Sequence, residues 1–220
     1  MKKAFIFSII VAIVMILGSC GNKTVKVPFD NGDSLETANV DPSLYGICGE
    51  ATAMNTLQLV TDTGDTLILD LSVAQEQNKI LGGLHSGDRM VVVPNEKLDT
   101  AIMVINQSTL LGDWVMPNPI DGSDEIGISI KEGGIAESIL QNSIIYRTWR
   151  LIRGQLEIVM VREGGTEEEE VYLYDIVKLG ADSLVIEDAE DRFEYGRQRP
   201  KEEYGKEVEL EESSYDDFKM

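Results

Sequence analysis

The sequence of 220 residues predicts an all-β protein, with a small five-stranded barrel followed by an eight-stranded up-and-down barrel. Three observations support this fold class. Short runs rich in valine, isoleucine, leucine and threonine follow one another along most of the chain. Apolar and polar side chains alternate within several of these runs. Glycine, aspartate and asparagine residues separate the runs at short intervals, as expected for strands that are joined by tight turns.

The N-terminus has the layout of a bacterial export signal. Two lysines precede an apolar run, residues 4–17, which is too short to span a bilayer as a helix. The run ends in the letters LGSC, whose last residue is Cys20. This order resembles the lipobox of bacterial lipoproteins, in which the cysteine sulfur receives lipid and the chain is cut before the cysteine. We therefore expect residues 1–19 to be a lipoprotein signal peptide, with the alternative that the cysteine follows an ordinary signal peptide by chance.

The lipobox implies a cellular location and a mode of membrane attachment. Cys20 would carry acyl chains such as palmitate and hold the protein on a lipid bilayer. The next residue, Gly21, is not an aspartate, which is compatible with transfer to the outer membrane of a Gram-negative cell. No acidic cluster follows that would direct export to the cell surface, so the periplasmic face is the expected location. Residues 20–43 are rich in glycine, asparagine, aspartate and serine, and predict a flexible tether.

Residues 44–107 predict the small barrel. Five strands are expected, at 44–50, 55–61, 65–72, 88–94 and 98–105. A barrel of OB or SH3-like type fits about sixty residues in this order, which is an analogy of fold and not of function. OB barrels often bind oligonucleotides, but this segment has 3 basic and 8 acidic residues, so a structural or protein-contact role fits better. Cys48 has no disulfide partner if Cys20 is lipidated, and is expected to be a buried thiol.

Residues 108–199 predict the second barrel. Its eight strands are expected at 110–115, 125–131, 134–140, 144–152, 155–162, 171–179, 183–187 and 193–198. Ile126, Ile128 and Ile130 share one face of the second strand, and glycines punctuate the runs at hairpin-like intervals. An up-and-down meander is the simplest connection, and the segment is long enough to close a compact barrel. Residues 200–220 are mostly acidic and predict a disordered tail.

The second barrel resembles the lipocalin-like domains of Gram-negative lipoproteins. The features that carry the resemblance are Gly112-x-Trp114, Tyr146 with Trp149, Tyr174-x-Ile176 and Tyr195-x-Arg197. The resemblance covers residues 109–198. It implies that Trp114, two residues after Gly112 in the first strand, plugs one end of the barrel. It also implies that Arg197 from the last strand lies across the indole as a cation–π partner.

The barrel interior is the expected site of function. Strand parity directs a mostly apolar set of side chains inward: Ile128, Ile130, Trp149, Ile158, Met160 and Tyr174. An open interior would hold a small apolar or aromatic ligand in a cavity of roughly 300 Å³ or more. The alternative is that the side chains fill the barrel, which then serves as a structural or protein-interaction module of the cell envelope.

Charge and composition narrow the classes of function. The 39 acidic and 19 basic residues give a formal charge of −20, which disfavours nucleic acid as a partner. One histidine and two cysteines leave little material for a metal cage, and no nucleophile–base pair or phosphate loop stands out. We therefore expect no cofactor, no metal and no catalysis. The expected partners are the bilayer, a small apolar ligand and an envelope protein.

Overall fold

The computed structural model describes residues 41–120, 122, 125–162, 164 and 168–198. The predicted signal peptide, Cys20, most of the tether and the acidic tail lie outside the described residues. The described strands account for most of these ranges, so the all-β fold class is confirmed. No helix in the described ranges has the length and apolarity that a bilayer span requires.

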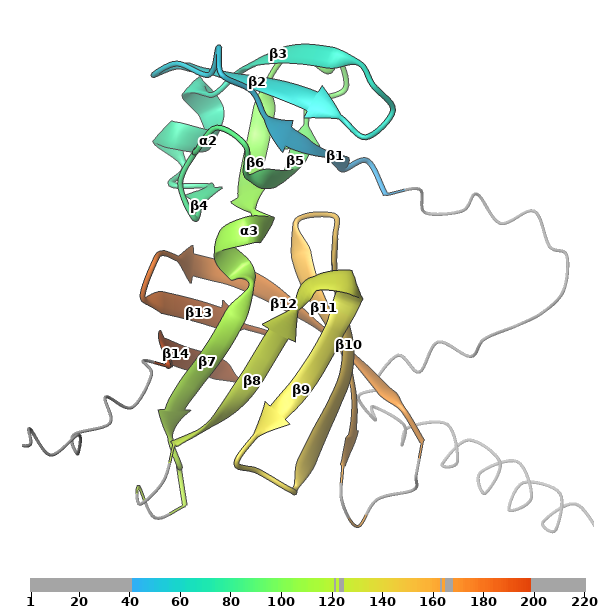
Figure 1. Cartoon of the computed structure of the whole chain (residues 1–220), viewed down its shortest axis with the longest axis vertical. Helices are drawn as coiled ribbons and strands as arrows, with labels where there is room; N and C mark the ends of the chain where they lie inside the picture. The colour runs from blue at the N-terminus through green and yellow to red at the C-terminus, as the bar shows by residue number, and fades with distance from the viewer. Residues whose placement is uncertain (1–40, 121, 123–124, 163, 165–167, 199–220) are drawn as a thin grey trace, which may run out of the picture. The chain divides into compact units, whose positions relative to one another are not determined.

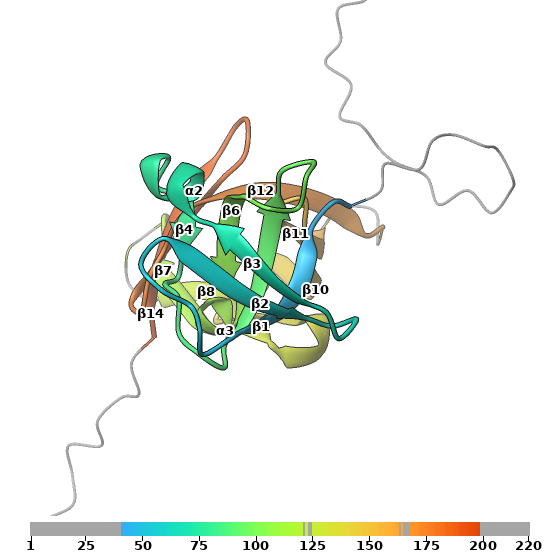
Figure 2. The same cartoon turned by 90° about the horizontal axis from the view of Figure 1, so that it is seen from above.

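The N-terminal part of the fold is a six-stranded sheet in the order β3-β2-β1-β5-β6-β4. Figure 2 shows β3, β2 and β1 side by side. All neighbouring strands are antiparallel except β4 and β6, which are parallel. The strands are β1 (Leu44–Cys48), β2 (Thr56–Thr61), β3 (Thr66–Asp70), β4 (Ile80–Leu81), β5 (Arg89–Pro94) and β6 (Ala101–Asn106), with one short helix, α2 (Ser72–Glu76), between β3 and β4.

The sixth strand, β4, is absent from the sequence prediction, which has five strands in a barrel. β4 has two residues, too few to show alternation, and Ile80 and Leu81 pair with Val104 and Ile105 much later in the chain. The sheet curves until the end of β3 meets the start of β6, where the backbone N–H of Asp70 donates to the Asp99 carbonyl oxygen at 2.9 Å.

The second part of the fold is a closed antiparallel barrel in the order β10-β11-β12-β13-β14-β7-β8-β9 (Figure 1). Consecutive strands are neighbours, and β14 pairs with β7 to close the barrel, as the predicted up-and-down meander requires. The strands are β7 (Gly112–Pro117), β8 (Glu125–Lys131), β9 (Ile135–Ile139), β10 (Ile144–Ile152), β11 (Gln155–Arg162), β12 (Glu170–Leu179), β13 (Ser183–Glu187) and β14 (Arg192–Arg197).

Two hydrophobic clusters form the core. One lies within the sheet and contains Leu57, Leu59, Leu69 and the free thiol Cys48, all almost fully buried. The other fills the barrel and also includes Leu81, Val91 and Ile105 from the sheet. Burying these side chains contributes roughly 1.5–3 kcal/mol each. That residues 44–107 and 108–199 are separable units stays a prediction, and the shared cluster implies that either part alone would expose apolar surface.

A short helix, α3 (Gln107–Leu110), lies where the sequence predicts the boundary between the two barrels. Its N-cap is Asn106, which is fully buried and accepts a hydrogen bond from the Thr109 N–H at 2.9 Å. The Asn106 amide nitrogen donates to the Asp88 carboxylate at 2.6 Å and to the Gly83 carbonyl oxygen at 3.3 Å. All hydrogen-bonding groups of this buried amide are therefore engaged, and they fix the chain where it passes from β6 into β7.

Candidate functional site

One end of the barrel, which we call the closed end, is sealed by Trp114 and Arg197. Trp114 has no exposed surface, and its indole Nε1–H donates to the Leu110 carbonyl oxygen at 2.8 Å. The guanidinium carbon of Arg197 lies 4.2 Å from the centre of the Trp114 ring system. This is a cation–π contact in which the polar groups of both partners are also hydrogen-bonded. The structure thus brings together the two residues that the lipocalin-like resemblance singles out.

The Arg197 guanidinium also bonds the C-terminal turn of α3. Nη2 donates to the Thr109 carbonyl oxygen at 2.7 Å, Nη1 to that of Leu111 at 2.9 Å, and Nε to that of Ala181 at 2.5 Å. Thr109 and Leu111 lie at the C-terminal end of α3, where a helix leaves carbonyl groups without intrahelical partners, whereas Ala181 lies in the turn between β12 and β13. Sequence reasoning missed these contacts because it did not predict α3.

Gly112 is the third residue of the closed end. Its φ of +131° lies in the region that side chains rarely adopt, and a Cβ at this position would overlap Nη1 of Arg197. A glycine here lets the guanidinium reach the backbone of α3. The three predicted barrel-closing residues therefore lie in one contact network.

The predicted lining residues all face the interior. Ile128, Ile130, Trp149, Ile158, Met160 and Tyr174 are each at most 5% exposed and belong to one core cluster. The Trp149 indole N–H donates to the Lys131 carbonyl oxygen at 2.8 Å. Leu156, Ile176, Leu184 and Ile186 occupy the same cluster. The middle of the barrel is therefore a packed core, which leaves the end opposite Trp114 as the place where a ligand could enter.

That end carries an aromatic cluster, which we define as Tyr146, Tyr172, Tyr174, Phe193 and Tyr195. Tyr172 stacks on Tyr174 with ring centroids 6.1 Å apart, Phe193 packs edge-on against Tyr174 at 6.0 Å, and Phe193 stacks on Tyr195 at 6.2 Å. Tyr174 and Tyr195 are buried, whereas the other three are half-buried. The burial of the rings therefore decreases from the core toward the solvent. Parity could have identified Tyr172 and Phe193, which lie two positions from predicted or quoted inward residues.

The hydroxyl groups of the aromatic cluster are held in their neutral form. Burial is the main cause that raises the pKa of Tyr174 and Tyr195, and for Tyr195 the neighbouring Tyr146 adds to it. Burial also raises the pKa of Tyr146. Near pH 7 these phenols are hydrogen-bond donors and acceptors without charge, inside a mostly apolar wall.

Arg162 and Glu170 edge the aromatic cluster. The Arg162 guanidinium carbon lies 5.3 Å from the Tyr172 ring centre, and Nη2 donates to the Tyr172 hydroxyl at 2.8 Å. That hydroxyl donates to Glu170 Oε2 at 2.7 Å, and the Arg162–Glu170 ion pair closes the group at 3.3 Å. All three side chains are partly exposed. The group orients Tyr172 at the rim without sealing the end.

The wall of the barrel has a seam between β9 and β10. The two strands pair at a single position, Thr148 with Ile135. Nearer the turn, the Ser138 hydroxyl replaces the ladder: it donates to the Ile144 carbonyl oxygen at 2.6 Å and accepts from the Tyr146 N–H at 3.0 Å. Beside the aromatic cluster, the Ser138 side chain therefore takes the place of backbone hydrogen bonds between β9 and β10.

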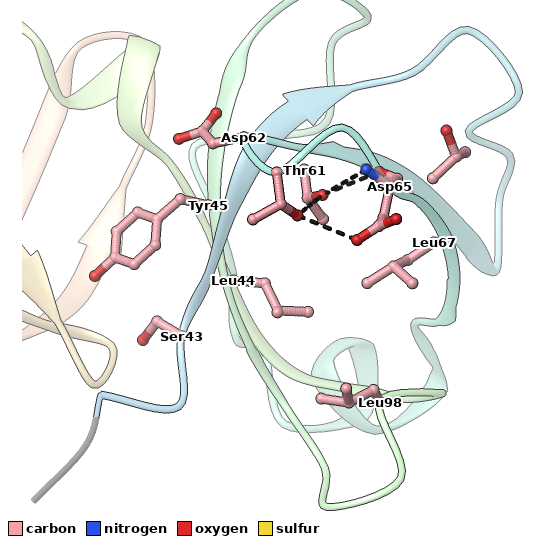
Figure 3. Close-up of a pocket in the computed structure, with 10 residues that line it drawn as sticks. Ser43, Leu44, Tyr45, Thr61, Asp62, Asp65, Leu67 and Leu98 are labelled. Carbon is pink, nitrogen blue, oxygen red and sulfur yellow. Dashed lines mark hydrogen bonds between the residues drawn. The ribbon is translucent and has the colours of Figure 1, made fainter.

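A pocket of about 570 Å³ lies outside the barrel, on the N-terminal sheet (Figure 3). It lies beside the start of β1, the β2–β3 hairpin and the β5–β6 turn. The residues that line it are Ser43, Leu44, Tyr45, Thr61, Asp62, Thr63, Asp65, Thr66, Leu67 and Leu98. This pocket was not predicted from the sequence, because its walls come from three segments that are separated along the chain.

In the described ranges, no three histidine, cysteine, aspartate or glutamate residues lie close enough together to hold a metal ion. His85, whose ring is mostly exposed, lies 3.2 Å from the Asp88 carboxylate.

Comparisons with known proteins found lipocalin-like matches for the barrel segment. Residues 106–198 match a family model described as lipocalin-like. A solved structure of a lipocalin-like protein from Bacteroides thetaiotaomicron VPI-5482 is 31% identical to the chain. The match covers 41% of this chain and 97% of that one, with a TM-score of 0.38. No curated protein matches the chain.

Proposed function

Residues 106–198 form a lipocalin-like domain, and from this premise we propose that the protein is a lipid-anchored, non-catalytic binding protein for a small apolar ligand. The observation that carries the proposal is the asymmetry of the barrel. Trp114 and Arg197 seal one end, whereas a graded aromatic cluster lines the other. Apolar walls with a few convergent polar groups are typical of small-molecule sites.

The chemistry of the aromatic cluster defines the ligand that fits it. Stacked and edge-on rings favour a flat or aliphatic molecule, and the neutral phenols can orient one hydroxyl, carbonyl or amide group. Because the middle of the barrel is packed, the ligand would lie against Tyr172 and Phe193 rather than deep within the core. Small rotations of these half-buried rings would deepen the site.

A matched pair of variants on β12 tests the site. Tyr172 faces the cluster, whereas its neighbour Leu173 faces solvent and is 47% exposed. With a fluorescent dye that brightens in apolar surroundings, Tyr172→Ser should weaken binding about tenfold or more, and Leu173→Ser should leave it unchanged. Native mass spectrometry of protein purified from its own envelope should show a retained small molecule. Equal dye binding by both variants would contradict the proposal.

The anchor is proposed from the sequence alone. Cys20 would carry the acyl chains after removal of residues 1–19, with the protein at the periplasmic face of the outer membrane. Cys20→Ser should move the protein from the membrane to the soluble fraction, and Cys48→Ser, which changes the buried free thiol, should not. Retention of the Cys20→Ser protein by the membrane would refute the anchor while leaving the barrel site untouched.

A second candidate function is that of a protein-interaction module with a filled barrel. It is favoured by an apolar strip on the outer wall, where Ile145 pairs with Val161 and Val159 pairs with Val171 next to Leu173. Ile145, Val171 and Leu173 are exposed. A photo-crosslinking amino acid at position 173 should capture an envelope protein if this strip is the functional surface. One at position 193 should capture none.

A further inference from the structure

Among the residues that the structure describes, the first half of β3 forms a strand edge of the N-terminal sheet that pairs with no other strand. At its C-terminal end β3 is tied to the β5–β6 turn by the hydrogen bond from Asp70 to Asp99. At the other end, β3 has β2 as its only neighbour in the described residues. The opposite edge of the sheet, β4, has two residues, and the N–H of the next residue, Gly82, donates to the Leu179 carbonyl oxygen of the barrel at 3.0 Å.

The hydrogen bonds at the ends of β3 determine which backbone groups face this edge. The Leu71 N–H donates to Asn55, and the Asp65 carbonyl oxygen accepts from Thr61, so odd-numbered residues point toward β2. The Asp70 N–H points the other way, to Asp99. Because backbone groups alternate along a strand, the N–H and C=O groups of Thr66 and Ile68 also point away from β2.

The pocket of about 570 Å³ adjoins this edge. In Figure 3, the side chains of Leu44, Leu67 and Leu98 lie around one space, and the Asp65 carboxylate lies above them. Leu98 is 48% exposed. The lining contains no lysine or arginine, and Asp65 accepts a hydrogen bond from the Thr63 hydroxyl at 3.2 Å but forms no ion pair within the described ranges. The pocket is therefore apolar where the three leucines lie and negative where Asp65 lies.

We propose that this edge is a docking site for an extended peptide segment of a partner protein, one in which apolar residues alternate with lysine or arginine. The peptide would add a strand beside β3 and bond the free groups of Thr66 and Ile68. One apolar side chain would enter the space between Leu44, Leu67 and Leu98, and a neighbouring cation would approach Asp65. Backbone pairing supplies affinity and side-chain pockets supply specificity in this mode of recognition.

Charge complementarity supports a basic partner. The chain carries a formal charge of −20, so an acidic peptide would be repelled by the whole molecule as well as by the rim. The site lies on the N-terminal sheet and not in the barrel, so it would operate whether or not the aromatic cluster binds a small molecule.

The test uses the full chain and a synthetic octapeptide in which valine and lysine alternate. Binding is followed by fluorescence anisotropy, and backbone amide exchange is followed by NMR. We expect a dissociation constant below about 1 mM and slowed exchange of the Thr66 and Ile68 amides in the complex. The Leu67 and Leu69 amides, which face β2, should change little. A peptide N-methylated at every residue, which has no backbone N–H to donate to the edge in either strand orientation, should bind about tenfold more weakly or worse.

Three variants separate the contributions. Ile68→Pro removes an N–H that β2 does not use, and should abolish peptide pairing while preserving the sheet. Asp65→Lys should reduce the preference for the lysine octapeptide over a valine–glutamate one, because it removes the local carboxylate and puts a cation in its place. Glu132→Lys, an equal change of charge on an exposed barrel residue, should have little effect. Dye binding at the aromatic cluster should persist in all three.

Several outcomes would overturn the proposal. They are absence of binding at about 1 mM lysine peptide, equal affinity for the N-methylated peptide, unchanged exchange at Thr66 and Ile68 in the complex, and equal weakening by Asp65→Lys and Glu132→Lys. The N-methylated peptide tests edge pairing on the unaltered protein, so the result stands even if Ile68→Pro fails to fold.

Discussion

The two ends of the barrel contain similar residue types and differ in the burial and the hydrogen-bond partners of those residues. Each has an arginine over an aromatic ring: Arg197 over Trp114 at the closed end and Arg162 over Tyr172 at the aromatic end. Arg197 gives hydrogen bonds to three backbone carbonyl groups, and the indole is fully buried. Arg162 instead bonds an exposed carboxylate and a phenol.

This difference explains why one end can be structural and the other can bind. A buried ring whose polar partners are all engaged has one low-energy arrangement, because any movement leaves a backbone carbonyl unpaired. The half-buried rings of Tyr172 and Phe193 rotate at a smaller cost, because Phe193 has no polar group and the partners of the Tyr172 hydroxyl, Arg162 and Glu170, are themselves partly exposed to water. The same residue types therefore give rigidity at the closed end and adaptability at the aromatic end.

Truncating the central ring at each end should have the largest and most unequal effect. Trp114→Ala should lower the free energy of unfolding by about 3–5 kcal/mol, since it leaves a cavity in a dry core. Phe193→Ala, at a half-buried ring, should cost about 1–2 kcal/mol. Urea denaturation with linear extrapolation measures both values. Equal losses would mean that the two ends are packed alike.

Removing the arginines should give the next largest contrast. Arg197→Gln deprives the Thr109 and Leu111 carbonyl oxygens of a charged donor and should cost about 2–3 kcal/mol. Arg162→Gln breaks a partly exposed ion pair and should cost about 0–1 kcal/mol. The same denaturation experiment compares them, and a cost at Arg162 as large as that at Arg197 would be inconsistent with an open rim.

Alkaline titration should affect the aromatic end. Burial raises the pKa of Tyr195 above its value in the unfolded chain, so the phenol stays protonated to a higher pH in the folded state. This contribution to stability is fully present below the unfolded pKa of about 10 and is lost as the pH rises beyond it. Tyr195→Phe should therefore flatten the fall in stability above about pH 10, measured by denaturation at a series of pH values. An unchanged slope would show that the ring is not protected from ionisation.

Acid titration should give the smallest effect, at a contact beside the closed end. The Asp41 carboxylate accepts hydrogen bonds from the Arg153 and Ser43 N–H groups, both at 3.0 Å, and lies 2.5 Å from the Tyr45 hydroxyl. Burial acts to raise its pKa, but these hydrogen bonds outweigh burial and lower it.

Because the folded pKa of Asp41 is lowered, its contribution is present above about pH 4 and is lost as the pH falls through the folded pKa. The contribution should be below about 1 kcal/mol, since Asp41 is only partly buried and solvent screens its contacts. Asp41→Asn should reduce stability near pH 7 and flatten the acid limb of the curve of stability against pH. An acid limb identical to that of the unaltered protein would show that Asp41 does not contribute to the loss of stability in acid.

The barrel was predictable from sequence where its interactions are local. The predicted bounds of β8, β10, β11 and β13 agree with the structure, because alternation and tight turns specify antiparallel hairpins. The start of β6 was misjudged: Leu98 and Asp99 belong to a turn in which the Asn95 side chain accepts from the Asp99 and Thr100 N–H groups. Leu98 has a φ of +58° there, which its apolar character does not indicate.

The candidate site was predictable only in part. Parity correctly directs Ile128 and Tyr174 inward, but whether inward side chains leave a cavity depends on how they pack together, which no single strand reveals. The contact of Arg197 with Trp114 came from a family resemblance. The hydrogen bonds from Arg197 to α3 and the pocket at β3 both depend on segments that are far apart in sequence. Neither feature therefore produces a local sequence pattern that could predict it.

The seam at Ser138 has a consequence for motion. Where a full ladder holds two strands, they separate only as part of a larger cooperative opening; where one hydroxyl holds them, a brief local fluctuation is enough. The Tyr146 amide should therefore exchange with solvent faster than amides in the fully paired β11. Repeated parting of β9 from β10 would turn the wall beside the aromatic cluster into a transient side entrance, admitting molecules that cannot pass between Tyr172 and Phe193.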